Sequence, residues 1–196
     1  MSFHHRGHRD RRDISVSSVC SVVKTISLIG LTFVTIACTK HEAAQPKKYV
    51  DAKRGVQFEY PSDWTTEEVT EQNVLLLSSP VQEANWQTNV FIELRSDLDM
   101  SQTPEQRLAT LADNLKTTKS GFALQSSRVF THASGAPAGE LIYMHSSQGV
   151  PLTEREVILW LEPGKALFVN GSAVTSLLSK YEPQMNVIFD SIRRGP

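Results

Sequence analysis

The chain has 196 residues and is poor in several features, each of which excludes a class of protein. It contains only two cysteines, Cys20 and Cys38. A secreted domain held together by disulfides needs more, so the fold must be stabilised by packing. No uncharged apolar run reaches the ~20 residues of a membrane-spanning helix. The sequence also lacks a glycine-rich phosphate loop and a G-x-S-x-G nucleophile elbow, which removes two common enzyme signatures.

Metal-binding and catalytic patterns are equally scarce. The segment HEAAQ (41–45) begins like the H-E-x-x-H zinc motif, but Gln45 stands where the second histidine must be. His132 and His145 flank a turn at Ser134-Gly135, and a simple hairpin there would separate them by roughly 25 Å. The two histidines therefore cannot share a metal ion, and we expect neither a metal nor a cofactor.

One acidic pair has the spacing of catalytic acids. Glu154 and Glu156 lie two residues apart and so share one face of a predicted strand. No third polar partner is visible near them in the sequence. The pattern therefore predicts a solvated strand start rather than an active site, and we expect a protein without catalytic residues.

The N-terminal region has the layout of an export signal. Five basic residues within the first 24 precede an uncharged stretch of thirteen residues, Thr25 to Ala37, and Cys38 follows it. That length is typical of a signal core and too short to span a bilayer. Removing residues 1–37 takes away five basic and two acidic residues and leaves 15 basic against 19 acidic, a net charge of about −4. Without a basic stripe, nucleic acid is not expected as a partner.

The residues before Cys38, VTIA (34–37), resemble the lipobox of bacterial lipoproteins. This resemblance implies cleavage before Cys38, a lipid thioether on its sulfur and an acyl chain on its amine. Together these chains would hold the protein on a membrane, facing the periplasm. Thr39 follows the cysteine; by the enteric sorting rule, Asp there would favour the inner membrane, so Thr39 favours the outer one. Two alternatives remain open: an uncleaved anchor helix starting near Ile14, and an ordinary secretory signal that leaves Cys38 unmodified.

The rest of the chain consists of a short tether and one domain. Residues 38–48 are polar and form the lipidated tether, while 49–196 form a single domain. Alternating apolar residues and turn signals predict strands at Tyr49–Tyr60, Val74–Leu77 and Asn89–Arg95, and four more between Phe122 and Val174, mainly in antiparallel hairpins. The run VILWL (157–161) is apolar on both faces and predicts a strand covered on both sides.

Two helices interrupt or end these strands. Thr103-Pro104 predicts a helix start, and the helical pattern then runs to Gly121. The last helix begins near Leu177 and contains Pro183, which should either kink it or mark the start of a new helix. Strands with two amphipathic helices predict an α+β fold, an α/β/α sandwich with a central, mainly antiparallel sheet.

Five segments in this domain resemble the PsbP-like and DcrB-like domains. They are GVQFEYPSDWTTEE (55–68), LLLSSP (75–80), TNVFIEL (88–94), GAPAGELIY (135–143) and IFDSIRR (188–194). The resemblance covers roughly 49–194 and implies the same sandwich. Members of the group are extrinsic photosystem proteins, envelope lipoproteins and secretion chaperones, which bind other proteins and mostly lack catalysis. For this chain, the resemblance implies a non-catalytic protein-binding or scaffolding lipoprotein of the cell envelope. The alternative is a small-ligand-binding module that uses a groove between sheet and helix.

The three tryptophans divide into two kinds. Trp64 follows a strand-ending proline and Trp160 lies within VILWL, so we expect both to be structural. Trp86 lies in the polar segment VQEANWQTN (81–89), where no pattern requires a large apolar side chain. It either folds back over the end of the core or anchors a partner protein, since tryptophan is enriched among interface hot spots. Trp86 is therefore the candidate partner-binding residue.

The signal and lipobox together predict that Cys38 carries lipid. Cells that express the wild-type protein should incorporate labelled palmitate into it, whereas Cys38→Ala should remain unlabelled and leave the membrane fraction. Equal labelling of the two proteins would contradict the assignment.

Overall fold

The computed structural model describes residues 45–70, 73–96, 98 and 101–195. The signal peptide, Cys38 and most of the tether lie outside these residues. The described residues belong to one compact unit. No helix among them is long and apolar enough to cross a membrane.

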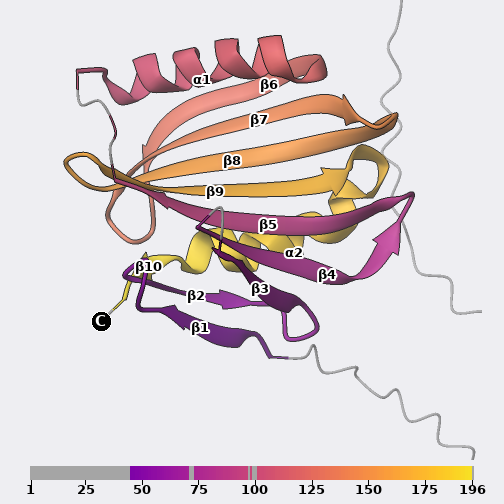
Figure 1. Cartoon of the computed structure of the whole chain (residues 1–196), viewed down its shortest axis with the longest axis horizontal. Helices are drawn as coiled ribbons and strands as arrows, with labels where there is room; N and C mark the ends of the chain where they lie inside the picture. Colours follow the sequence, from indigo (N-terminus) through magenta and orange to yellow (C-terminus); the bar gives the residue numbers. More distant parts are fainter. Residues whose placement is uncertain (1–44, 71–72, 97, 99–100, 196) are drawn as a thin grey trace, which may run out of the picture. The chain divides into compact units, whose positions relative to one another are not determined.

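Most of the domain is one large antiparallel sheet of seven strands in the order β3-β4-β5-β9-β8-β7-β6 (Figure 1). These strands are β3 (Thr65–Val69), β4 (Val74–Glu83), β5 (Trp86–Arg95), β6 (Ser120–Thr131), β7 (Pro137–Ser147), β8 (Val150–Glu162) and β9 (Lys165–Val174). A second sheet has the order β1-β2-β10, from β1 (Lys47–Asp51), β2 (Val56–Tyr60) and β10 (Arg193–Arg194). The helices are α1 (Pro104–Thr118), the short η2 (Thr175–Leu177) and α2 (Leu178–Ser191).

The two helices contact opposite faces of the large sheet. Alternate residues of a strand point to opposite faces. On β9, Phe168 belongs to the apolar cluster that contains α1, whereas Val169 belongs to the cluster that contains α2. The predicted α+β class is confirmed. The sandwich describes the layers only approximately, because α2 also contacts β2 of the small sheet while α1 lies mainly over the β6–β7 side of the large one.

The predicted doubly covered strand is part of β8. Val157 packs in the α2 cluster and Ile158 in the α1 cluster, and both are buried. The centre of the seven strands is β9, which pairs with β5 on one side and β8 on the other. Its central position brings polar residues of β9 beside those of β8, and this pairing builds the site described below.

Helix α1 starts as the sequence predicts. Thr103 caps it: its side chain accepts from the Gln106 backbone, and the Gln106 side chain accepts from the Thr103 backbone. This capping box satisfies two otherwise unpaired donors. The predicted end at Gly121 is wrong, because the helix already ends at Thr118 and Lys119 is extended. Gly121 instead adopts a positive φ of 67° where the β6–β7 register shifts, a position that favours glycine.

Helix α2 continues through Pro183 and closes the larger core. Its buried residues Tyr181, Met185, Ile188 and Phe189 pack against β2, β5 and β9. Trp64 joins this core, where it is 2% exposed and its indole Nε1 donates to Gln184 Oε1 at 2.8 Å. The structural role expected for Trp64 follows from these contacts.

Truncating Trp64 should therefore be costly. Trp64→Ala removes a fully buried aromatic side chain and should lower the free energy of unfolding by about 3–5 kcal/mol. Trp64→Phe keeps most of the packing and loses the hydrogen bond to Gln184, so its loss should be clearly smaller. Denaturant unfolding curves measure both, and an alanine variant as stable as wild type would show that this core is assigned wrongly.

Candidate functional site

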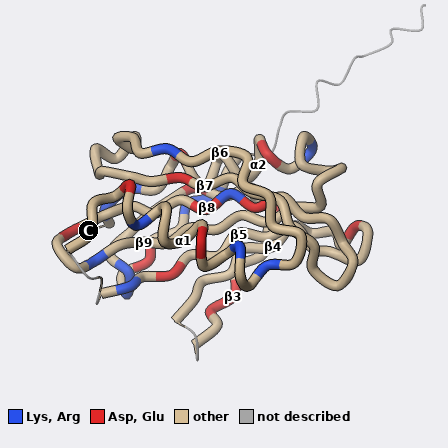
Figure 2. The backbone as a smooth tube through the Cα atoms, turned by 90° about the horizontal axis from the view of Figure 1, so that it is seen from above, with Lys and Arg blue, Asp and Glu red and all other residues tan. Residues whose placement is uncertain are grey.

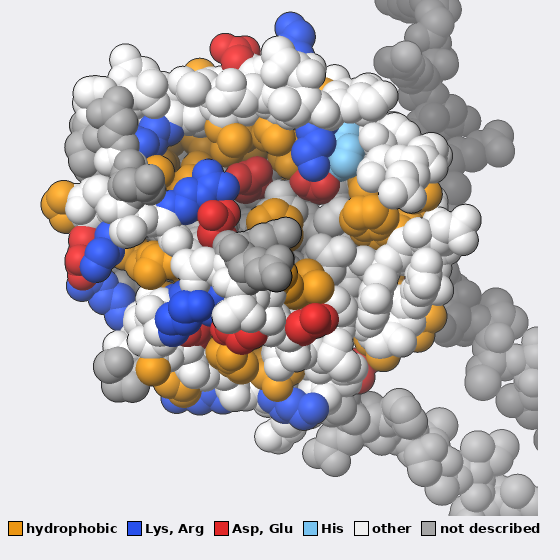
Figure 3. Space-filling model, in the orientation of Figure 1, with side chains coloured by type: hydrophobic (Ala, Val, Ile, Leu, Met, Phe, Trp, Pro, Cys, Tyr) orange, Lys and Arg blue, Asp and Glu red, His pale blue; other side chains and the backbone are white. Residues whose placement is uncertain are grey.

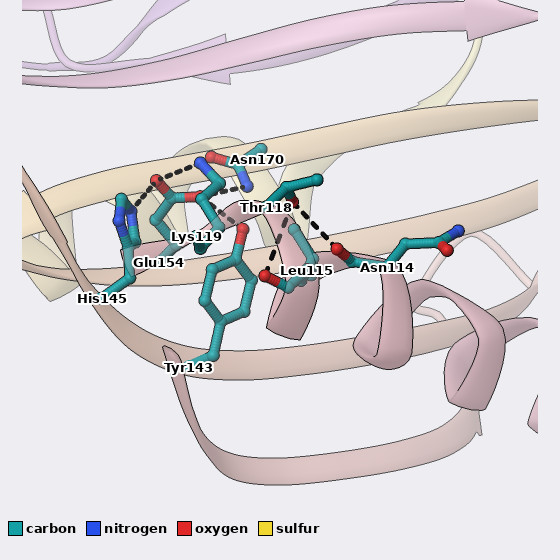
Figure 4. Close-up of polar contacts among 8 residues, drawn as sticks. All are labelled: Asn114, Leu115, Thr118, Lys119, Tyr143, His145, Glu154 and Asn170. Carbon is teal, nitrogen blue, oxygen red and sulfur yellow. Dashed lines mark hydrogen bonds and ion pairs between the residues drawn. The ribbon is translucent and has the colours of Figure 1, made fainter. Parts of the chain in front are cut away.

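The most unusual group in the domain is the buried carboxylate of Glu154 on β8. The residue is 6% exposed, and Figure 4 shows four side chains converging on it. Tyr143 donates its hydroxyl to Oε2, and Asn170 Nδ2 donates to the same oxygen at 3.1 Å. His145 Nε2 lies 2.6 Å from Oε1, and Lys119 Nζ lies 3.4 Å from it. The prediction of a solvated strand start without polar partners is wrong for Glu154.

Strand pairing explains why these residues meet. Tyr143 stands directly opposite Glu154 in the β7–β8 ladder, and His145 follows two residues later on the same face. On the other side of β8, Ser172 stands opposite Glu154 and Asn170 opposite Glu156. Cross-strand neighbours on one face have Cβ atoms about 4.5–5.5 Å apart, which lets short side chains touch. Three consecutive strands thus place one polar cluster on the α1 face.

The network keeps Glu154 ionised. Burial alone would raise the pKa of Glu154, but the hydrogen bond from Tyr143, the charge of Lys119 and the contact with His145 hold it below its ordinary value. The same burial and the adjacent carboxylate raise the pKa of Tyr143, so this phenol stays protonated and remains a donor. The two effects stabilise one arrangement: a negative carboxylate surrounded by donors.

Glu156, the next residue on this face, differs from Glu154. It is half-buried. Burial raises the pKa of Glu156 to about 7, and the charge of Glu154 adds to this shift, while Arg95 and Asn170 oppose it. Near neutral pH its carboxyl group therefore changes charge readily. A titratable group poised in this way is typical of functional sites.

Both acids lie on the floor of a groove of about 420 Å³ between α1 and the sheet. Phe91, Phe168 and Leu111 form apolar parts of its lining, and Lys119 and Arg95 are basic parts. Figure 3 shows the surface hollowed beneath α1, with acidic and basic side chains facing one another there. Elsewhere, charges of both signs are interspersed along the strands (Figure 2). The groove has the size of a small-molecule site.

Several buried polar atoms in this groove have no hydrogen-bond partner among the described residues. They are Asn170 Oδ1, Ser172 Oγ and Trp86 Nε1. Asn170 and Ser172 are each 3% exposed. Such atoms are rare in folded proteins because each costs about 1–3 kcal/mol when left unpaired. All three atoms belong to residues that line the groove.

The structure places the other candidate residues as follows. Trp86 is the first residue of β5, paired with Glu83 rather than lying in a loop, and it is half-buried against the groove. His132 binds the Phe189 carbonyl of α2 at 2.8 Å, whereas His145 belongs to the α1 face. Among the described residues no group of three or more His, Cys, Asp or Glu has a metal-binding arrangement. Cys38 lies outside the described residues.

Comparison with known proteins bears on the fold. No protein-family model matches the chain, and no curated protein does. Solved structures do match. LpqN of Mycobacterium tuberculosis, described as involved in cell envelope biogenesis, is 18% identical with a TM-score of 0.58, over 78% of this chain and 91% of LpqN.

Two further structures share the architecture. The cyanobacterial PsbP of Synechocystis is 15% identical with a TM-score of 0.56, covering 81% of this chain and 97% of that one. The Ran-binding protein Mog1p of Saccharomyces cerevisiae is 6% identical with a TM-score of 0.54, covering 76% and 94%. At these identities the likeness shows the fold alone: the domain has a PsbP-like fold.

The raised pKa of Glu156 predicts how stability depends on pH. The folded protein holds this proton more tightly than the unfolded chain, whose ordinary pKa is 4.5. The resulting stabilisation is complete below pH 4.5 and is lost as the pH rises through 7. Glu156→Gln, neutral at every pH, should be more stable than wild type at pH 8 by on the order of 2 kcal/mol, and the gain should shrink towards pH 4.5.

Denaturant unfolding at pH 4.5, 6 and 8 measures this difference. Glu162→Gln is the matched control, since Glu162 is exposed on the same strand. A gain in stability at pH 8 that persists undiminished at pH 4.5, or that Glu162→Gln shares, would contradict the buried-acid explanation.

Proposed function

We propose that this chain is a lipid-anchored, non-catalytic binding protein of the bacterial cell envelope, and that its binding site is the groove between α1 and the sheet. The single observation that carries the binding role is the set of buried polar atoms without partners on the groove floor. A ligand that pairs with these atoms would gain the free energy of the hydrogen bonds it forms with them.

The state of Glu154 supports binding rather than catalysis. Tyr143, Asn170, His145 and Lys119 together occupy both of its oxygens. A nucleophile or general base needs a free lone pair directed at the substrate. Glu154 is better suited to hold its neighbours in place, which leaves Glu156 to face the occupant.

Two observations support the location in the envelope. The apolar core that ends in Ala37-Cys38 predicts lipidation and a membrane anchor facing the periplasm, with the outer membrane favoured by Thr39. The structural neighbour LpqN is a protein involved in cell envelope biogenesis. The ligand could also be a side chain of a partner protein in the envelope. In that case Trp86, at the groove wall, would contact the partner.

Filling the groove tests this proposal. Leu111 lies on α1 and lines the groove, so Leu111→Trp should occupy part of its volume. Lys116→Trp, on the exposed side of the same helix, is the matched control. A set of small aromatic and polar fragments should raise the melting temperature of the wild type and of Lys116→Trp, because binding to the folded state stabilises it.

For Leu111→Trp the same fragments should lose most of that shift while circular dichroism shows an unchanged fold. Fragments that stabilise all three proteins equally would place their binding elsewhere. If no fragment stabilised the wild type, the groove would not be a small-molecule site.

A further inference from the structure

Resting on this proposed function, we infer that the groove recognises a primary ammonium group, bound by the side-chain oxygens of Glu156, Asn170 and Ser172. The group comes either from a free small amine or from a lysine side chain of a protein partner. Both sources present the same chemistry to the floor of the groove.

The main support is the arrangement of hydrogen-bond acceptors on the groove floor. Glu156 and Asn170 stand directly opposite each other on β8 and β9, and Ser172 is two residues from Asn170 on the same face. Asn170 Oδ1 and Ser172 Oγ are buried without partners among the described residues. An ammonium has three N–H donors and no acceptor. Three acceptor side chains on adjacent strand positions match that number.

The hydrogen bonds of the Glu154 network explain why Asn170 and Ser172 have acceptor atoms left for a ligand. Asn170 turns its Nδ2 towards Glu154, which leaves its carbonyl oxygen available. Ser172 offers a hydroxyl oxygen with two lone pairs. The Glu154 carboxylate fixes the orientation of the amide: its nitrogen donates to Glu154 and also lowers the pKa of Glu156, while its carbonyl oxygen remains an acceptor on the floor.

Charge in the groove favours a cation at Glu156. Around that carboxyl group lie Glu154 on β8, Arg95 on β5 and Lys119 on α1. Lys119 already pairs with Glu154, and Arg95 donates to Glu93 at 2.8 Å while its guanidinium lies over the Phe168 ring. Both existing cations thus have other anions or rings to bind. A bound ammonium would supply Glu156 with a counter-ion of its own.

The walls suit the organic part of such a ligand. Phe91 and Trp86 line the groove beside the polar floor, together with Leu111 and Leu115 of α1. Aromatic faces attract cations, and the aliphatic side chains can pack on a hydrocarbon stem. The groove therefore selects a charged amine on an apolar carrier over a fully polar cation.

Binding should also depend on pH, because only ionised Glu156 pairs with an ammonium. The pKa of Glu156 is about 7 in the free protein. The ionised fraction falls about tenfold between pH 8 and pH 6, and the apparent affinity should fall by the same factor. An amine that remains charged over this range does not itself contribute to the change.

Three probes of similar shape test the charge requirement: phenethylamine, neutral 2-phenylethanol and anionic 3-phenylpropionate. NMR titration of the purified protein at pH 6 and 8 gives each dissociation constant. Phenethylamine should bind at least tenfold more tightly than the other two at pH 8. Alcohol or acid binding as tight as the amine would overturn the ammonium inference while leaving the groove proposal intact. Absence of binding by any of the three, with no fragment effect in the Leu111→Trp comparison, would remove both.

A fourth probe, N-acetyl-lysine amide, distinguishes the two sources. If it binds as tightly as phenethylamine, the inference holds with a lysine side chain of a protein partner as the occupant. If it binds much more weakly, the inference holds with a free amine. In either case phenethylamine binding must depend on Glu156.

Variants separate a binding role from a structural one. Ser172→Ala should weaken phenethylamine binding about tenfold or more, the loss typical of one hydrogen bond to a charged group. Its melting temperature should stay level or rise, because an unpaired buried hydroxyl has been removed. Glu156→Gln should abolish both the preference for the amine and the pH dependence, while Glu162→Gln changes neither. A Ser172→Ala variant that melts lower and binds normally would show that Ser172 is structural.

Discussion

Removing the Glu154 carboxylate from water is the constraint on which the arrangement of this domain depends. An ion in a protein interior costs several kcal/mol unless donors surround it. Here the donors come from β7, β9 and the residue that ends α1, so the charge ties three separate elements together. The position of the end of α1 over the sheet, and the register of β7, β8 and β9, must agree for the carboxylate to be satisfied.

The same arrangement leaves polar atoms of the groove without partners and raises the pKa of Glu156. Satisfying Glu154 uses the amide nitrogen of Asn170 and the hydroxyl of Tyr143, which leaves Asn170 Oδ1 and Ser172 Oγ as acceptors without partners among the described residues. Glu156 then lies next to a permanent negative charge and shifts its pKa upwards. Sites that bind ligands commonly sacrifice stability in this way, since an empty pocket with unpaired polar groups is less stable than a filled one.

Much of the architecture could be predicted from the sequence, because it depends on local patterns. The capping box at Thr103 and the apolar run 157–161 carry their own signals. Strand β3 was missed because its residues are exposed or half-buried and show no alternation of apolar and polar side chains. The Glu154 cluster was missed for a different reason: its members are spread over 51 residues of sequence, from Lys119 to Asn170, and strand pairing brings most of them together. A usable signal existed, since polar side chains recur two residues apart on each strand (Tyr143 and His145, Glu154 and Glu156, Asn170 and Ser172), but only a correct register reveals that they share one face.

Glu156 is a half-buried acid of the groove, and the proposed binding depends on its pairing with a cationic ligand. A carbon-detected NMR titration of its side-chain carboxyl tests this directly, first in the free protein and then saturated with phenethylamine. We expect a midpoint of about 7 in the free protein, falling by roughly one pH unit or more when the amine is bound, as tenfold coupling between the two requires. A midpoint near the ordinary 4.5 in both states would contradict it.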